Sequence, residues 1–388
     1  LNAVAAIITM FFLYTYGMTN LAAFIEAFGK NPSFRPRFRF FHWTAALLGG
    51  LGCVGAALLI NAVAAVASLL LILGLLWYLK TRELEASFGD ARRGFVYTNV
   101  RKNLLRLRDL PEDAKNWRPT ILVLSGNPAS RETLVSYAVW LEAGRGIVLL
   151  ANVLRGTVHQ AAQRRRMAEK QLVEFCRSKS IQAFPVVAIG EDVSQSLSLL
   201  LQTTSLGPIR PNLAMFGWAS ASKDFAKQAN LMRIADGSHM SLVVLQDRGV
   251  PPVEKAGRID VWWRGRRNGE LMLLLAHLIT RNWEWLRAEI RVLRLIDGEA
   301  GREPASEALQ ELIHAARVDA TAVAVLANED KAFADVCLRN SFDADLVVLG
   351  FALPDEGKEE AFHQNFTAIT EKLPTTLLVR SSGREKLV

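Results

Sequence analysis

Charged residues are scarce in the first fifth of the chain. Residues 1 to 79 contain four Lys or Arg and one Glu, and the stretches 2–25 and 43–79 contain no charge at all. At about 1.5 Å per residue, a helix over 2–25 is long enough for a hydrocarbon core of about 30 Å, whereas one helix over 43–79 is too long. The pattern therefore predicts one membrane-spanning helix at 2–25 and a helical hairpin that turns at Asn61, with spans at 43–60 and 62–79.

The first arm of this hairpin is rich in small residues. They allow close approach of helices in lipid, where packing rather than hydrophobicity drives association. We expect helix contacts from Gly49, Gly52, Cys53, Gly55 and Ala56.

The sequence also lacks the common signatures of enzymes and metal sites. Its three cysteines are far apart and its six histidines are scattered, which excludes a disulfide framework and a closely spaced metal-binding motif. Nucleophile-elbow, phosphate-loop and zinc-protease motifs are absent. We expect neither an enzyme nor a metal site. The chain starts with Leu1, inside an apolar stretch, so we interpret it as a fragment.

Basic residues are concentrated in one short acid-free segment, GKNPSFRPRFRFFHW, where Lys30, Arg35, Arg37 and Arg39 lie between the two apolar stretches. Short basic loops stay on the cytoplasmic side of a membrane. The loop and the segment after the hairpin are then both cytoplasmic. A specific contact of the loop with lipid or with another domain stays open. Beyond residue 79 the charges are mixed, which argues against a nucleic-acid partner.

The rest of the chain predicts an α/β fold. Apolar runs such as TILVLSG, FPVVAIG and DLVVLGF alternate with amphipathic stretches, which favours a mostly parallel sheet covered on both faces. Four parts are expected: membrane helices at 1–79, a connecting helix or linker at 80–118, and two tandem α/β lobes at 119–250 and 251–388. The lobes are separate or form one continuous sheet.

Two features of the lobes have more than one interpretation. Ser125-Gly126-Asn127-Pro128 follows the first strand, where open α/β sheets bind phosphate, but it also fits a turn with a helix cap. A nucleotide cofactor is therefore left open. Four tryptophans fit core or interface positions better than a base-stacking surface: Trp262, Trp263, Trp283 and Trp285.

Five blocks of sequence resemble the C-terminal third of the cation-chloride cotransporter family. They are FFLYTYGMTNLAAFIEAF, NPSFRPRFRFFHWTAALLGGLGCVGAALLI, KNWRPTILVLSG, RIDVWWRGRRNGELMLLLAHLI and ADLVVLGFALP, in the family's order. Details such as RPRF and KNWRP resemble the potassium-chloride branch. The resemblance implies the last three membrane helices of a LeuT-type transporter, followed by a cytoplasmic regulatory domain.

The resemblance also implies a function and one ion-binding residue. It implies electroneutral symport of chloride with K⁺ or Na⁺, a multi-pass protein of the plasma or inner membrane, and a homodimer formed through the cytoplasmic domain and the last helices. Tyr16 in TYGMTN matches the family's chloride-binding tyrosine. Tyr14 lies about 200° around the helix from it and cannot face the same site. Arg35, Arg37 and Arg39 are then candidates for coupling the membrane part to the cytoplasmic domain. The alternatives are a membrane-anchored, universal-stress-like nucleotide sensor and an amino-acid permease relative with another substrate.

Overall fold

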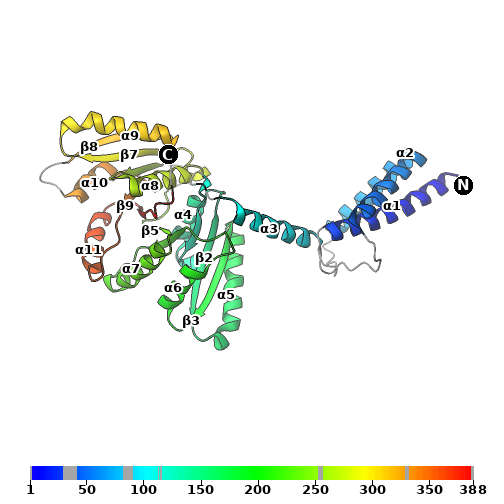
Figure 1. The fold of residues 1–388 in the computed structure, drawn as a ribbon, viewed down its shortest axis with the longest axis horizontal. Coiled ribbons are helices and arrows are strands. Elements are labelled where there is room, and N and C mark those ends of the chain that lie inside the picture. The colour runs from blue at the N-terminus through cyan, green and yellow to red at the C-terminus, as the bar shows by residue number, and fades with distance from the viewer. Residues whose placement is uncertain are drawn as a thin grey trace. The chain divides into compact units, whose positions relative to one another are not determined.

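The chain forms two compact units, Leu1–Leu110 and Pro111–Val388 (Figure 1). The computed structural model describes residues 2–28, 42–81, 91–111, 113, 116–251, 257–327 and 332–385. The basic loop with Lys30, Arg35, Arg37 and Arg39 lies outside the described residues.

The described part of the first unit is helical, with α1 (Asn2–Phe28), α2 (Trp43–Thr81) and α3 (Ala91–Asp109). Two segments of the described residues are long and apolar enough to cross a membrane, Ile8–Phe28 and Trp43–Leu75. These criteria are length and composition alone. The predicted connecting helix is α3.

Asn61 interrupts α2, as the sequence predicts. Its backbone is extended (φ −161°, ψ 101°), and its side-chain Oδ1 accepts a hydrogen bond from the N–H of Ala64 at 3.0 Å. This contact caps the helical arm that follows. Ala57 before the break and Ala65 after it lie in one buried cluster with Met10 and Tyr14 of α1, so both arms pack on the same part of α1.

Small residues set the distance between α1 and the first arm of α2. A Cβ at Gly50 would lie 2.9 Å from the side chain of Leu21, and one at Gly17 would lie 3.2 Å from Cys53. A Cβ at Gly49 would lie 3.1 Å from Asn20. The prediction of close contact is confirmed for Gly49 and Cys53. Gly52 and Gly55 make no such contact among the described residues, where a Cβ at either would meet nothing within 4 Å, and their role stays a prediction.

The second unit is built on one continuous ten-stranded sheet in the order β3-β2-β1-β4-β5-β10-β9-β6-β7-β8. The apolar runs of the sequence form the strands: β1 (Thr120–Val123), β2 (Ile147–Arg155), β3 (Ala183–Gly190), β4 (Leu213–Gly217), β5 (Ser241–Gln246), β6 (Arg258–Trp262), β7 (Glu289–Ile296), β8 (Thr321–Leu326), β9 (Leu346–Gly350) and β10 (Thr376–Arg380). All neighbouring strands are parallel, except that β5 and β10 pair with each other in antiparallel orientation.

The sheet is an internal repeat. Strands β1 to β5 are arranged 3-2-1-4-5, and β6 to β10 repeat that arrangement in reverse across the β5–β10 pair. Because β5 and β10 are antiparallel, the carboxyl ends of the strands in the two halves lie at opposite edges of the sheet. We call residues 119–250 lobe 1 and residues 251–388 lobe 2.

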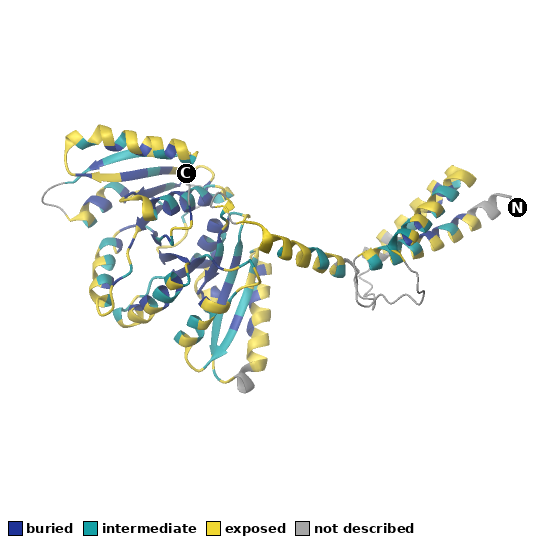
Figure 2. Ribbon diagram, viewed as in Figure 1, coloured by how far each residue is buried: buried dark blue, intermediate teal, exposed yellow. Residues whose placement is uncertain are grey.

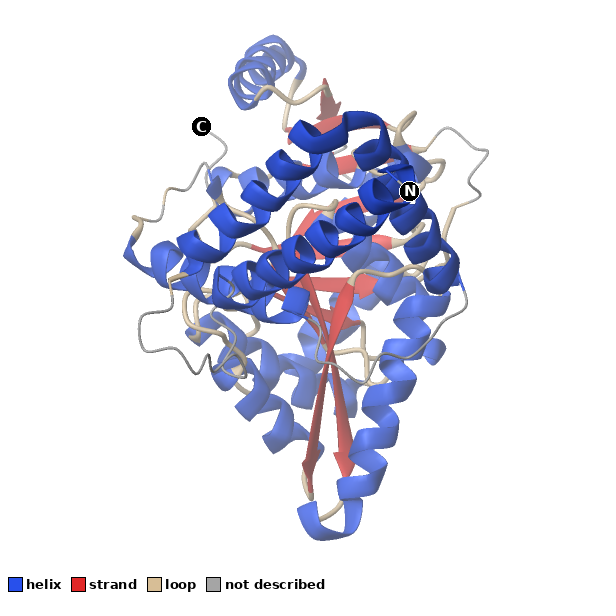
Figure 3. Cartoon of the chain, turned by 90° about the vertical axis from the view of Figure 1, so that its right-hand side faces the viewer, coloured by secondary structure: helices blue, strands red, loops and turns tan. Residues whose placement is uncertain are grey.

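Helices cover both faces of the sheet, as Figure 3 shows. One core contains residues of α4, α5, α8 and α9, and the other contains residues of α6, α7, α10 and α11. Their bounds are α4 (Glu132–Glu142), α5 (Val158–Ser178), α6 (Val193–Thr203), α7 (Ser222–Gly237), α8 (Arg266–Ile279), α9 (Arg302–Ala316), α10 (Phe333–Ser341) and α11 (Glu359–Thr370). Both sides of the central strands are therefore buried (Figure 2), which explains their continuous apolar sequences.

Contacts on both faces join the two lobes. On one face, Asn282 of lobe 2 donates its Nδ2–H to the carbonyl oxygen of Trp140 at 2.9 Å. On the other, the rings of Phe225 in α7 and Phe362 in α11 stack with centroids 5.6 Å apart. Each phenylalanine is the fourth residue of its helix. The packing at the centre thus follows the same two-fold repeat as the strands.

Candidate functional site

Tyr14 and Tyr16 project in different directions from α1, as their spacing predicts. Tyr14 is 8% exposed and donates its hydroxyl to the carbonyl oxygen of Ala65 at 2.8 Å. Tyr16 is 63% exposed, so its hydroxyl is not used by the helix packing of this unit. The chloride-binding role of Tyr16 stays a prediction.

Asn20 lies one turn after Tyr16 and has a structural role. Its amide Nδ2–H donates to the carbonyl oxygen of Tyr16 at 3.0 Å, and its side chain packs where a Cβ at Gly49 would lie. Asn20 is therefore part of the contact between α1 and the first arm of α2.

In the second unit, two edges of the sheet have the geometry at which open α/β folds bind ligands. Such folds bind at the carboxyl ends of the strands, where the strand order reverses. In lobe 1 this point lies between β1 and β4, and in lobe 2 it lies between β6 and β9.

A polar side chain of the protein lies at the lobe 1 reversal point, and another lies next to the lobe 2 point, at the ends of β9 and β10. In lobe 1, Arg131 donates an Nη1–H to the carbonyl oxygen of Leu124 at 3.3 Å. In lobe 2, Asn268 donates to the carbonyl oxygen of Phe351 and accepts from the N–H of Ser381, each at 3.0 Å. Ligand space is therefore found beside these points rather than at them.

The Ser125–Pro128 turn lines a cavity of about 290 Å³ with the start of α4, with β2 and with α6. Its polar side chains are engaged within the turn. Asn127 accepts from the N–H of Ala129 at 3.2 Å, and the Ser125 hydroxyl points to the carbonyl oxygen of Ala151 at 3.4 Å. The turn-and-cap interpretation of this segment is confirmed. The cavity contains one guanidinium, that of Arg131.

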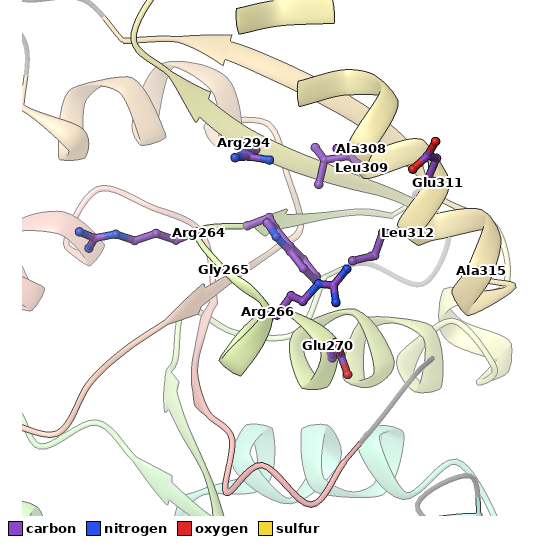
Figure 4. Close-up of a pocket in the computed structure, with 11 residues that line it drawn as sticks. Arg264, Gly265, Arg266, Glu270, Arg294, Ala308, Leu309, Glu311, Leu312 and Ala315 are labelled. Atoms are coloured by element: carbon purple, nitrogen blue, oxygen red, sulfur yellow. The ribbon is translucent and has the colours of Figure 1, made fainter. Parts of the chain in front are cut away.

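A larger cavity, of about 510 Å³, lies at the carboxyl ends of β6 and β7 in lobe 2. Figure 4 shows it between the start of α8 and the side of α9. Arg264, Arg266 and Arg294 line it together with Glu270 and Glu311. Leu309, Leu312 and the edge of Trp263 provide apolar lining.

The packing of Trp263 depends on a glycine in α8. A Cβ at Gly269 would lie 2.5 Å from the indole of Trp263, so a larger residue would displace the ring. Trp263 is 7% exposed and, with Trp262 and Trp285, belongs to the core, which confirms the prediction for these three. Trp283 is 69% exposed and does not belong to the core, and an interface position for it stays a prediction.

The buried thiols of the second unit are not poised for chemistry. Burial raises the pKa of Cys176 above its ordinary value, and it raises the pKa of Cys337 to about 12. A thiol is a nucleophile only as the thiolate, so both are protonated and inert at neutral pH. Within the described residues, no group of three or more His, Cys, Asp or Glu could hold a metal ion.

A sequence model for solute carrier family 12 matches residues 131–249 and 251–335, more than half of the chain. The chain belongs to this family, the cation-chloride cotransporters. A model for amino acid permeases matches residues 1–123. Both families are membrane transporters, and membership in solute carrier family 12 places this chain in a transport protein.

The chain is similar to several solved structures, and the first of those that follow shows the same α/β fold. The cytoplasmic domain of a prokaryotic cation chloride cotransporter matches with a TM-score of 0.51 and 14% identity, over 69% of this chain and 97% of that one. A universal stress protein from Archaeoglobus fulgidus matches with a TM-score of 0.47 and 11% identity, over 69% and 98%. A protein of unknown function from Pseudomonas aeruginosa gives 0.41 and 13%, over 71% and 96%.

The arginines of the lobe 2 cavity were not identified from the sequence of this cotransporter chain. A signal was present, because the strand RIDVW is followed by WRGRR, which places three cations at the carboxyl end of β6. Arg294 lies thirty residues further along the chain, on β7. Only the pairing of β6 with β7 brings it to the same edge.

Proposed function

We propose that this chain is the C-terminal part of a secondary active transporter that moves chloride together with an alkali cation, K⁺ or Na⁺, in an electroneutral symport. The observation that carries the proposal is the match of more than half of the chain to solute carrier family 12. Within the family, the RPRF and KNWRP details favour the potassium-chloride branch.

The proposed membrane part consists of three spans of a LeuT-type fold, at residues 2–25, 43–60 and 62–79. A helix over Trp43–Leu75 would be about 50 Å long at 1.5 Å per residue, well beyond a hydrocarbon core of about 30 Å. The break at Asn61 and the packing of both arms against α1 support a hairpin of two short spans.

In this proposal, Tyr16 holds chloride on the face of α1 that the other two spans leave free. A phenol hydroxyl donates a hydrogen bond without carrying a charge, so it holds an anion weakly enough to release it. The exposure of Tyr16 in this unit supports the role, because the remaining helices of the transporter would complete the site there.

The second unit is proposed to be cytoplasmic and to serve dimerisation and regulation. The transporter would lie in the plasma or inner membrane, with Lys30, Arg35, Arg37 and Arg39 on the cytoplasmic side. We further propose that the three arginines couple the membrane part to the α/β unit. Charge reversal at all three should then impair transport or dimerisation, and unchanged transport, dimerisation and insertion would rule out the coupling.

A second candidate follows from the amino acid permease match over residues 1–123. In this alternative, the membrane part belongs to a transporter with the same helical scaffold and a different substrate. Chloride dependence of cation uptake distinguishes the two candidates.

The decisive experiment is rubidium uptake by the complete transporter in proteoliposomes, with and without chloride. We expect uptake to need chloride. The Tyr16→Phe variant should weaken apparent chloride affinity by roughly tenfold or more, because hydrogen bonds to charged groups contribute about 1.5–3 kcal/mol. Tyr14→Phe is the matched control, because its hydroxyl is bonded to Ala65 and it should retain chloride affinity.

Two results would contradict these proposals separately. Rubidium uptake that ignores chloride would favour the permease alternative. Uptake that needs chloride but is equally sensitive to chloride in the Tyr16→Phe variant and in wild type would support the transporter class while removing Tyr16 from the site.

A further inference from the structure

The cavity of about 510 Å³ in lobe 2 has the size of a small-molecule site and lies where α/β folds place ligands. Arg264 follows β6, Arg266 begins α8 and Arg294 belongs to β7, so three separate elements each contribute an arginine to the lining of one cavity. In Figure 4 the side chain of Arg264 extends away from those of Arg266 and Arg294.

These three arginines have no hydrogen-bond or ion-pair partner within the described part of the chain. Arg291, on the same strand as Arg294, holds both carboxylate oxygens of Asp260, at 2.8 and 2.7 Å. Arg380 pairs with Asp236 in the same bidentate way. The cavity thus gathers cations that the fold itself does not neutralise.

The acidic residues of the cavity do not cancel this charge. Glu270 already has an interaction of its own. Glu311 lies on α9, on the side of the cavity opposite the end of β6 (Figure 4). Arginine side chains that line one cavity without a partner repel one another, and a bound anion would offset that repulsion.

The rest of the lining is apolar and is fixed in place. Leu309 and Trp263 are buried core residues whose edges reach the cavity, and the glycine at 269 holds the indole close against α8. Ala308 and Ala315 have small side chains, so this side of α9 leaves space for a ligand next to Leu312. An inorganic anion would satisfy the arginines but leave this apolar wall in water.

We propose that the lobe 2 cavity binds a small organic anion, in which a phosphate or carboxylate group joins Arg266 and Arg294 and an apolar body packs on α9. Guanidinium groups recognise both anions through paired N–H donors. The site is separate from the proposed ion pathway, and its ligand would add a chemical input to the α/β unit.

Isothermal titration calorimetry tests the proposal on the complete 388-residue chain in phosphatidylcholine nanodiscs. Phenyl phosphate and benzoate serve as probes for the two anionic groups, and inorganic phosphate serves as a probe without an apolar body. We expect at least one aromatic probe to bind, and to bind at least tenfold more tightly than inorganic phosphate. Affinity should fall as salt is raised, because the arginines are exposed.

Two kinds of variant separate this site from non-specific binding. Arg266→Gln and Arg294→Gln should each weaken binding by roughly tenfold, the usual loss for one hydrogen bond to a charged group. Ala308→Leu should fill the space and abolish binding without removing a charge, while Gln310→Leu, at an exposed position of α9 outside the cavity lining, is the matched control and should bind normally.

The outcomes are unambiguous. Failure of both aromatic probes to bind at millimolar concentration would overturn the proposal, as would binding that Ala308→Leu leaves unchanged. Equal affinity for inorganic phosphate and phenyl phosphate would overturn the organic character of the ligand. Binding that is lost in Arg131→Gln, at the lobe 1 cavity, but kept in Arg266→Gln would overturn the proposal and place the site in lobe 1. None of these readouts depends on transport.

Discussion

The two lobes have the same strand order and the same pairing across their centre, but the edges where ligands would bind differ. At the end of β1, a turn of small polar residues satisfies its own groups and leaves a cavity of about 290 Å³. At the equivalent end of β6, a cavity of about 510 Å³ is lined by Arg264, Arg266 and Arg294. The repeat therefore determines where a site can lie, and the loop residues determine whether there is one.

A second difference lies at the amino ends of the same strands. In lobe 1, the N–H of Ile147 bonds the carbonyl oxygen of Pro119, and in lobe 2 the N–H of Glu289 bonds that of Gly257, both at 2.9 Å. The preceding residue on the second strand is Gly146 in lobe 1 and Ala288 in lobe 2. Each lobe thus has one glycine at this point, because the two backbones approach closely there. In lobe 1 it is Gly146, before the second strand of the pair, and in lobe 2 it is Gly257, before the first.

The largest effect should come from breaking the symmetric contact at the centre. Phe225 is fully buried and stacks on Phe362, which is only partly buried. Phe225→Ala should lower the free energy of unfolding by about 3–5 kcal/mol, the usual cost of removing a buried phenyl ring, and Phe362→Ala should cost less. Urea unfolding of residues 111–388 measures both values. Equal losses would show that burial at the two positions is equivalent despite the structure.

The exchange of glycine between the lobes gives the next prediction. A Cβ at Gly146 would collide with the carbonyl oxygen of Pro119, so Gly146→Ala should destabilise the unit by about 1–3 kcal/mol. Adding Pro119→Gly imitates lobe 2 and should recover part of the loss. Gly237→Ala, where a Cβ meets nothing within 4 Å, is the control and should be neutral or slightly stabilising. An additive double variant would argue against the proposed exchange.

The polar side chains that bond at these strand ends in the two lobes should differ in how much they stabilise the fold. Asn268 makes two hydrogen bonds across the ends of β9 and β10, whereas Arg131 makes one long bond in lobe 1. Asn268→Ala should cost about 1–3 kcal/mol, since it leaves two partly buried backbone groups unpaired, and Arg131→Ala should cost less than 1 kcal/mol. The same unfolding assay compares them. A larger loss for Arg131 would mean that the lobe 1 point is the more tightly held.

The sequence predicted the elements well because its signals are local. Ten apolar runs became ten strands, and Asn61 was identified as a break because 37 uncharged residues are too long for one span. It left open whether the lobes share one sheet, because the continuous sheet depends on the antiparallel pairing of β5 with β10 across 130 residues of chain. For the same reason it missed the arginine cavity, whose members meet only through strand pairing.

The smallest effect concerns the pKa of His277, which depends on residues of both lobes. Burial, Arg281 of its own lobe and Arg145 of lobe 1 lower the pKa of His277 in α8. The unfolded chain, with an ordinary histidine pKa of about 6.5, then binds the proton more readily than the folded chain. This contribution to stability is complete above that value and is lost as the pH falls below it, towards the lowered pKa.

Arg145→Gln removes the cation from lobe 1. It should raise the pKa of His277 and lessen the loss of stability in acid. NMR titration of the imidazole, assigned with His277→Gln, measures this change. An unchanged pKa in Arg145→Gln would mean that the two lobes are not electrostatically coupled at this joint.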